Sequence, residues 1–173
     1  MLTRCDECGF DPVAIVGPGV ADELCRIGSR YRAPLTRLLP GEDASLLRKR
    51  PQEQVWSAIE YAVHARDVFR LFERRVLAIL AEEGAALEIV DHDKAVDQGR
   101  YRELVPIEVA SEVLVSAEGL ASRLRLLSEA EWDRCGAHLT EARSIREIAQ
   151  RALHEGRHHL LDVGRVLRSA RGR

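Results

Sequence analysis

The sequence is dominated by apolar residues that recur every three or four positions, the period of a helix with one buried face. Four segments carry this pattern, and no segment shows a convincing alternation of apolar and polar residues, the mark of a half-buried strand. The apolar positions begin at Val20, Tyr61, Ala110 and Ile145 in the successive segments. This pattern predicts an all-α protein with the architecture of a four-helix bundle.

Start and stop signals define the limits of these helices. Capping boxes at Ser57 and Ser144 open the second and last helices, and Pro106 opens the third. We expect Pro34 to kink or shorten the first helix, because proline lacks the backbone N–H that a helix interior needs. Residues 85–104 show no clear periodicity, so we expect a long crossover connection there.

Length and charge exclude several classes of protein. A chain of 173 residues is read as one domain, with a cysteine-containing leader over residues 1–17 and a helical bundle over residues 18–170. The 26 basic and 28 acidic side chains leave no positive excess, so nucleic acid is not expected as a partner. Neither a membrane-spanning apolar run nor a signal peptide is visible. We therefore expect a cytoplasmic protein without a membrane partner, and its arginine-rich composition is typical of a GC-rich bacterial genome.

The last predicted helix carries the densest set of side chains that can bind a metal. Two pairs lie one turn apart, His154 with His158 and Glu155 with His159. A helical wheel places His159 in the apolar stripe and Glu155 on its flank, whereas His154 and His158 point away from the stripe. We therefore expect Glu155 and His159 to face the bundle interior, with the two other histidines as the alternative ligand pair.

A third ligand is available on the second helix, where His64 lies one turn before Val68. A carboxylate and an imidazole buried without partners would be costly, and a metal ion would remove that cost. Two histidines and one glutamate leave an open coordination position, as in catalytic zinc sites. Asp162 follows His159 by one turn and could orient its imidazole, or could instead be an exposed carboxylate paired with Arg165.

The cysteines suggest a second site. Cys5 and Cys8 form a C-x-x-C pair in the leader, and Cys135 and His138 form a C-x-x-H pair before the last helix. Together these four residues have the ligand types of a closed Cys3His zinc site. The alternative is a free dithiol near the terminus, with Cys135 and His138 unrelated to it.

Two of these segments also carry a family resemblance. The run Trp56-Ser-Ala-Ile-Glu-Tyr-Ala-Val-His64 and the motif Glu155-x-x-x-His159-x-x-Asp162 resemble the DinB-like superfamily of metal-binding four-helix bundles. The motif is similar to that of its mycothiol-dependent maleylpyruvate isomerase branch. The resemblance implies a divalent metal, usually zinc, held by His64, Glu155 and His159. Other branches use H-x-x-x-H on the last helix, a pattern that His154 and His158 also satisfy.

The resemblance also implies an activity, that of a thiol-dependent transferase or isomerase that uses mycothiol, bacillithiol or glutathione. We therefore expect a metal-dependent, thiol-using enzyme that acts on a small electrophilic molecule. One alternative is a metal-binding bundle without catalysis, with a stress-linked or interaction role. Another is a metal-dependent hydrolase, because an open zinc position can activate water as well as a thiol. Apolar positions on the first helix would suit a homodimer.

Overall fold

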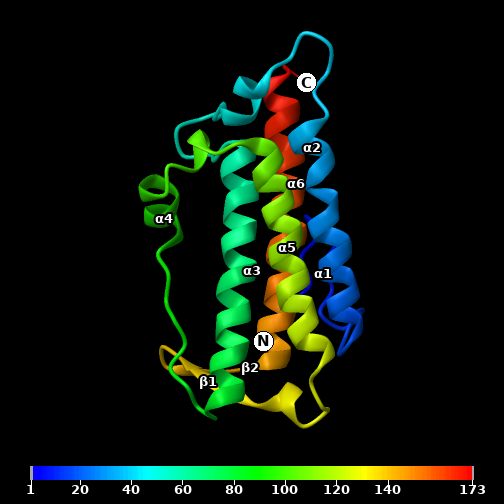
Figure 1. The fold of residues 1–173 in the computed structure, drawn as a ribbon, viewed down its shortest axis with the longest axis vertical. Coiled ribbons are helices and arrows are strands. Elements are labelled where there is room, and N and C mark those ends of the chain that lie inside the picture. Colours follow the sequence, from blue (N-terminus) through cyan, green and yellow to red (C-terminus); the bar gives the residue numbers. More distant parts are fainter. Residues whose placement is uncertain (1, 173) are drawn as a thin grey trace.

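The computed structural model describes residues 2–172 and places four long helices side by side (Figure 1). Each of α1 (Gly19–Arg30) and α3 (Ala58–Ala81) packs against both α5 (Pro106–Arg125) and α6 (Ile145–Ala170). The predicted all-α four-helix architecture is confirmed. Within residues 2–172, no helix combines the length and the apolar character that a membrane crossing requires.

The order of the helices requires a long crossover. In Figure 1, α1 and α6 run toward the end of the bundle where the C-terminus lies, and α3 and α5 run the opposite way. Because α3 and α5 are parallel neighbours, residues 82–105 must return along the side of the bundle. This segment contains α4 (His92–Gln98) and the 3-10 turn η2 (Tyr101–Glu103). The crossover was predicted and the short α4 was not, because within it only Val96 is buried and no periodic face forms.

The first predicted helix divides in two. The chain turns at Tyr31, between α1 and the short α2 (Arg32–Thr36), which contains Pro34. Proline donates no hydrogen bond, and its ring clashes with the carbonyl four residues earlier, here that of Arg30. The interruption therefore falls one turn before the proline, as the sequence indicated.

The predicted capping boxes begin α3 and α6. The backbone N–H of Ser57 donates to Glu60 Oε2 over 2.7 Å, and that of Ser144 donates to Glu147 Oε2 over 3.1 Å. Pro106 occupies the first turn of α5, where its missing N–H is not needed. Two further 3-10 turns, η1 (Ala44–Arg48) and η3 (Glu131–Asp133), lie in the connections.

A short hairpin that the sequence did not predict closes one end of the bundle. Strands β1 (Cys135–His138) and β2 (Glu141–Ser144) pair antiparallel, and Leu139 adopts a left-handed conformation in the turn, with φ of 54°. Backbone bonds between Ala137 and the segment after α3 hold the hairpin in place. The sequence shows no sign of the hairpin, because strands of four residues with little burial show no alternation of apolar and polar residues.

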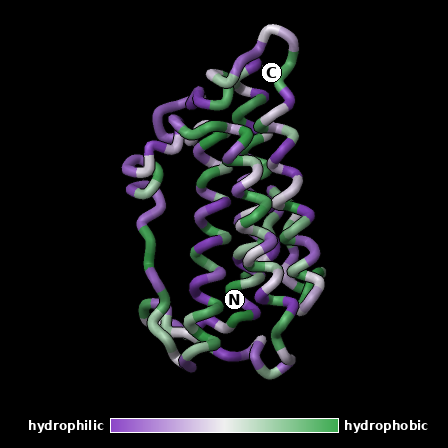
Figure 2. The backbone as a smooth tube through the Cα atoms, viewed as in Figure 1, coloured by the Kyte–Doolittle hydropathy of each residue, from purple (hydrophilic) through white to green (hydrophobic). Residues whose placement is uncertain are grey.

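The core lies where the helices face one another, and hydrophobic and hydrophilic segments alternate along each helix in Figure 2. Gly156 lets α6 approach α3 closely, because a Cβ atom there would lie 2.6 Å from Cζ of Phe69. The Tyr31 hydroxyl donates to the Gly156 carbonyl over 2.7 Å. The apolar residues of α1 are also buried. The exposed large apolar side chains among residues 2–172 lie outside α1 and α2.

Candidate metal centre

Three of the predicted ligands converge between α3 and α6. His64, Glu155 and His159 each offer one ligand atom, and these atoms lie within 4.8 Å of one another. Nε2 of His159 is 3.1 Å from Oε2 of Glu155, and the His64 and His159 rings are 4.7 Å apart at their centroids. The pair that the helical wheel favours on α6 thus lies beside His64.

Aromatic side chains at the start of α3 enclose this cluster. The Trp56 ring lies 5.0 Å from that of His64, and Tyr61 stacks on His159 at 5.4 Å. His64 is only 5% exposed. Aromatic rings thus pack against both imidazoles of the cluster.

The cluster contains one histidine that is neutral at physiological pH. Burial lowers the pKa of His64 to about 3, and the nearby His159 and His92 add to this effect. A neutral imidazole presents a free lone pair, which is the form that binds a metal.

His159 behaves in the opposite way because two carboxylates contact its ring. Burial alone would lower the pKa of His159, but hydrogen bonds to Asp162 and Glu155 outweigh it and raise the pKa to about 9. Burial would raise the pKa of Glu155, but its hydrogen bond to His159 and the charges of the neighbouring histidines together lower it. In the metal-free protein, a proton therefore lies between Glu155 and His159, at a position that a cation can take.

Asp162 occupies the position expected of a residue that orients a ligand. Its Oδ2 lies 3.1 Å from Nδ1 of His159, on the side of the ring away from Glu155. The Asp162 side chain is 15% exposed, and its Oδ1 also lies 3.5 Å from Nη1 of Arg165. Both contacts anticipated from the sequence are present, and the carboxylate is not a loosely solvated one.

A cavity of about 310 Å³ opens beside Glu155. Its walls come from α3, the crossover, the hairpin and α6, and three arginines line it: Arg75, Arg143 and Arg151. Arg75 donates to the Glu88 carbonyl and Arg143 contacts Glu141, whereas Nε of Arg151 is buried and has no hydrogen-bond partner among the described residues. The sequence did not identify this cationic wall, because arginines are frequent throughout the chain.

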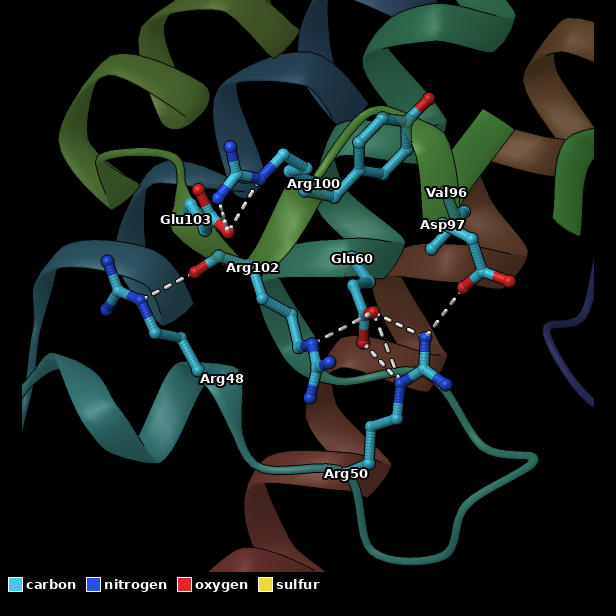
Figure 3. Close-up of a pocket in the computed structure, with 9 residues that line it drawn as sticks. Arg48, Arg50, Glu60, Val96, Asp97, Arg100, Arg102 and Glu103 are labelled. Atoms are coloured by element: carbon cyan, nitrogen blue, oxygen red, sulfur yellow. Dashed lines mark hydrogen bonds and ion pairs between the residues drawn. The ribbon is translucent and has the colours of Figure 1, made fainter. Parts of the chain in front are cut away.

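A larger cavity, of about 500 Å³, has a different character (Figure 3). Figure 3 shows Arg50 and Arg102 facing the carboxylate of Glu60 at the start of α3. Glu60 is 2% exposed and also accepts from Ser57, so its charge is fully paired. This cavity contains none of the clustered metal ligands, and its ion pairs fasten the connecting loops to α3.

The second predicted ligand set does not come together. Cys135 and His138 lie on β1, whereas the ligand atoms that cluster with Cys5 and Cys8 belong to His154 and His158. The hairpin adjoins the start of α6, and His154 lies nine residues beyond Ile145, about 14 Å along the helix at 1.5 Å per residue. The proposed Cys3His combination is therefore corrected. His138 instead lines the cavity beside Glu155, and the Cys135 thiol donates to the Asp133 carbonyl.

His154 and His158 also do not replace Glu155 and His159 beside His64. The cluster around His64 contains only the predicted pair among the described residues. The two other histidines point away from the bundle interior, as the wheel indicated, but they are half-buried because the leader covers them.

Comparisons with known proteins agree with this architecture. The family model described as the DinB superfamily matches residues 29–163. Among solved structures, the chain is similar to YfiT from Bacillus subtilis, described as "a probable metal-dependent hydrolase with an unusual four-helix bundle topology". The TM-score is 0.72 at 16% identity, over 86% of each chain, a likeness that concerns the fold. No curated protein matches the chain.

Proposed function

The chain belongs to the DinB superfamily, and from that premise we propose that it is a metal-dependent enzyme that transfers a small thiol to, or isomerises, a small anionic electrophile. The observation that carries this proposal is the position of the His64, Glu155 and His159 cluster beside a cavity with a cationic wall. Its use of a reduced thiol fits a location in the bacterial cytoplasm.

The donor set fits a divalent metal, and zinc best. Two imidazoles and one carboxylate are the ligands of several catalytic zinc sites, in which a fourth position stays open. His64 is neutral and Glu155 is ionised, so only the proton on His159 must leave. When bound, such a cation stabilises a thiolate near neutral pH, as it would a hydroxide.

The residues of the cavity supply binding and orientation. Arg151 lines this wall together with Arg75 and Arg143, and the guanidinium groups of these arginines can donate to a carboxylate. Apolar side chains of the crossover, including Ile89 and Val90, also line the cavity. A small substrate with one or two carboxylates therefore fits this space. Asp162 holds the His159 ring in place through Nδ1.

The test is a titration of the zinc-loaded protein with mycothiol, bacillithiol and glutathione by calorimetry. We expect one of the three thiols to bind the zinc-loaded protein and none to bind the metal-free protein. His64→Gln should remove both one zinc equivalent and the thiol binding, while Cys135→Ser, a change outside both clusters, should leave them unchanged. Failure of all three thiols to bind the zinc-loaded wild type would contradict thiol use.

Hydrolysis is a second candidate, because the similar fold of YfiT is described as that of a probable metal-dependent hydrolase. The same cluster and cavity would serve it, with water in place of the thiol. Turnover of anionic esters or amides by the zinc-loaded protein without any thiol would favour hydrolysis. A metal-binding bundle without catalysis is less well supported, because it gives the unpartnered Arg151 no role.

A further inference from the structure

The leader brings a second group of metal ligands onto α6. Cys5, Cys8, His154 and His158 each offer one ligand atom, and all four atoms lie within 4.8 Å of one another. Sγ of Cys5 lies 3.6 Å from Nδ1 of His158, although the two residues are 153 positions apart in the chain. All four side chains are half-buried, and the two cysteines are free thiols.

The leader is folded tightly around its two cysteines. The Cys5 N–H donates to the Phe10 carbonyl and the Gly9 N–H to the Cys5 carbonyl, both over 2.9 Å, and Gly9 has a φ of 67° that favours glycine. This turn brings the Cys5 and Cys8 sulfurs together beside the two histidines of α6.

The helix side of the cluster contains one unsatisfied ring nitrogen. His154 and His158 lie one turn apart on α6, on a face different from that of Glu155 and His159. Nε2 of His154 is buried and has no hydrogen-bond partner among the described residues. Phe10 is 1% exposed and packs on the His154 ring at 5.0 Å, so water has little access to this nitrogen from that side. A buried ring nitrogen of this kind is costly unless a ligand satisfies it.

We propose that Cys5, Cys8, His154 and His158 bind a zinc ion in a closed Cys2His2 site that fastens the leader to α6. The spacings C-x-x-C and H-x-x-x-H are those of structural zinc sites. Two thiolates and two imidazoles in a tetrahedral arrangement select zinc over harder cations. Because the protein supplies four ligands, this site has no open position for a substrate and its role is structural.

Other contacts along α6 fit this role. The Gln150 side chain donates to the Ile15 carbonyl over 2.6 Å, and Arg165 donates to Glu7 over 2.6 Å. The leader therefore contacts α6 at points on both sides of the cluster. A zinc ion in the middle would close a loop of more than 150 residues, between Cys5 and His158, and so favours the folded state over the unfolded chain.

The proposed site is independent of the proposed function, and cobalt substitution tests it directly. Thiolate ligands give Co²⁺ a charge-transfer band in the near ultraviolet, and the His64 cluster contains no thiolate. We expect the wild type to bind two equivalents of Co²⁺ and to show this band. Cys8→Ser should lose the band and one equivalent, and the matched controls Cys25→Ser and Cys135→Ser should keep both.

The two clusters can fail separately in this experiment. His64→Gln should lose one equivalent of Co²⁺ and keep the thiolate band. His158→Gln should instead weaken the thiolate band and leave the metal at the His64 cluster bound. A wild-type spectrum without the thiolate band would overturn the proposal. This result does not depend on whether the variants fold. Retention of two equivalents by folded Cys8→Ser would overturn it as well.

Discussion

Oδ2 of Asp162 lies 3.1 Å from Nδ1 of His159, and this contact fixes the ring whose other nitrogen faces Glu155. Carboxylates that hold a ligand imidazole in this way contribute about 10- to 100-fold to metal affinity. We expect Asp162→Asn to weaken zinc binding at the His64 cluster by roughly that factor. Competition with a chromophoric chelator, in a Cys8→Ser background that removes the second proposed site, measures the change.

The matched control for this substitution is Asp22→Asn. Asp22 is an exposed carboxylate on α1 whose ion pair with Arg125 is 2.9 Å long. Because Asp22 does not contact His64, Glu155 or His159, the loss of its charge should leave the zinc affinity unchanged. Equal affinities for Asp162→Asn and Asp22→Asn would show that Asp162 does not support His159.

The raised pKa of His159 predicts a proton release on metal binding. In the metal-free protein this pKa is about 9, above the ordinary value of about 6.5. The stability gained from the protonated ring is therefore complete below about pH 6.5 and is lost as the pH rises through about 9. Zinc needs the neutral ring, so its apparent affinity should rise ~tenfold per pH unit up to about pH 9.

Calorimetry in two buffers of different ionisation enthalpy counts these protons. In the Cys8→Ser background near neutral pH, we expect about one proton released per zinc from the His64 cluster. His64 contributes none, because its pKa is about 3. A count near zero would mean that His159 is already neutral in the metal-free protein.

Arg151 is expected to bind the anionic part of the substrate. Its Nε is buried without a partner beside the cavity, and a hydrogen bond from a charged donor to a carboxylate contributes about 1.5–3 kcal/mol. With maleate as a small dicarboxylate probe, Arg151→Gln should weaken binding to the zinc-loaded protein roughly tenfold or more. Arg74→Gln is the control, since Arg74 is exposed and pairs with Glu88. The same affinity in both variants would remove Arg151 from the binding site.

Gly156 should be intolerant of even one added methyl group. A Cβ atom there would lie 2.6 Å from Cζ of Phe69, and overpacking of this kind costs about 1–3 kcal/mol in the free energy of unfolding. Gly164 lies on the same helix, where the nearest atom to an added Cβ is a flexible arginine nitrogen at 3.6 Å. Gly164→Ala should therefore be neutral or stabilising by up to ~1 kcal/mol. Urea denaturation of the metal-free variants would contradict this account if both changes had the same effect.

Much of the His64 cluster could be predicted from the sequence because helical geometry is local. Residues four apart share a face, and the apolar stripe of α6 distinguished Glu155 and His159 from the two neighbouring histidines. The choice of His64 depended on two helices packing side by side, which the bundle architecture provides. The capping boxes at Ser57 and Ser144 likewise act within one turn, and both begin helices in the structure.

The cluster of Cys5, Cys8, His154 and His158 could not be predicted in the same way. Cys5 and Cys8 have no periodic pattern that fixes where the leader lies, so their partners depend on tertiary contacts far along the chain. Cys135 and His138 had suitable spacing, but the hairpin that holds them was not visible in the sequence, because its strands are short and little buried. The exposed-looking face of α6 was in fact the one that the leader covers.

The central claim is that His64, Glu155 and His159 together hold one metal ion. Anomalous X-ray diffraction at the zinc absorption edge, from crystals of the zinc-loaded wild type, measures this directly. The account requires an anomalous peak in contact with one atom of each of these three residues. A zinc-loaded crystal with no peak there, or with zinc only at His154 and His158, would contradict it.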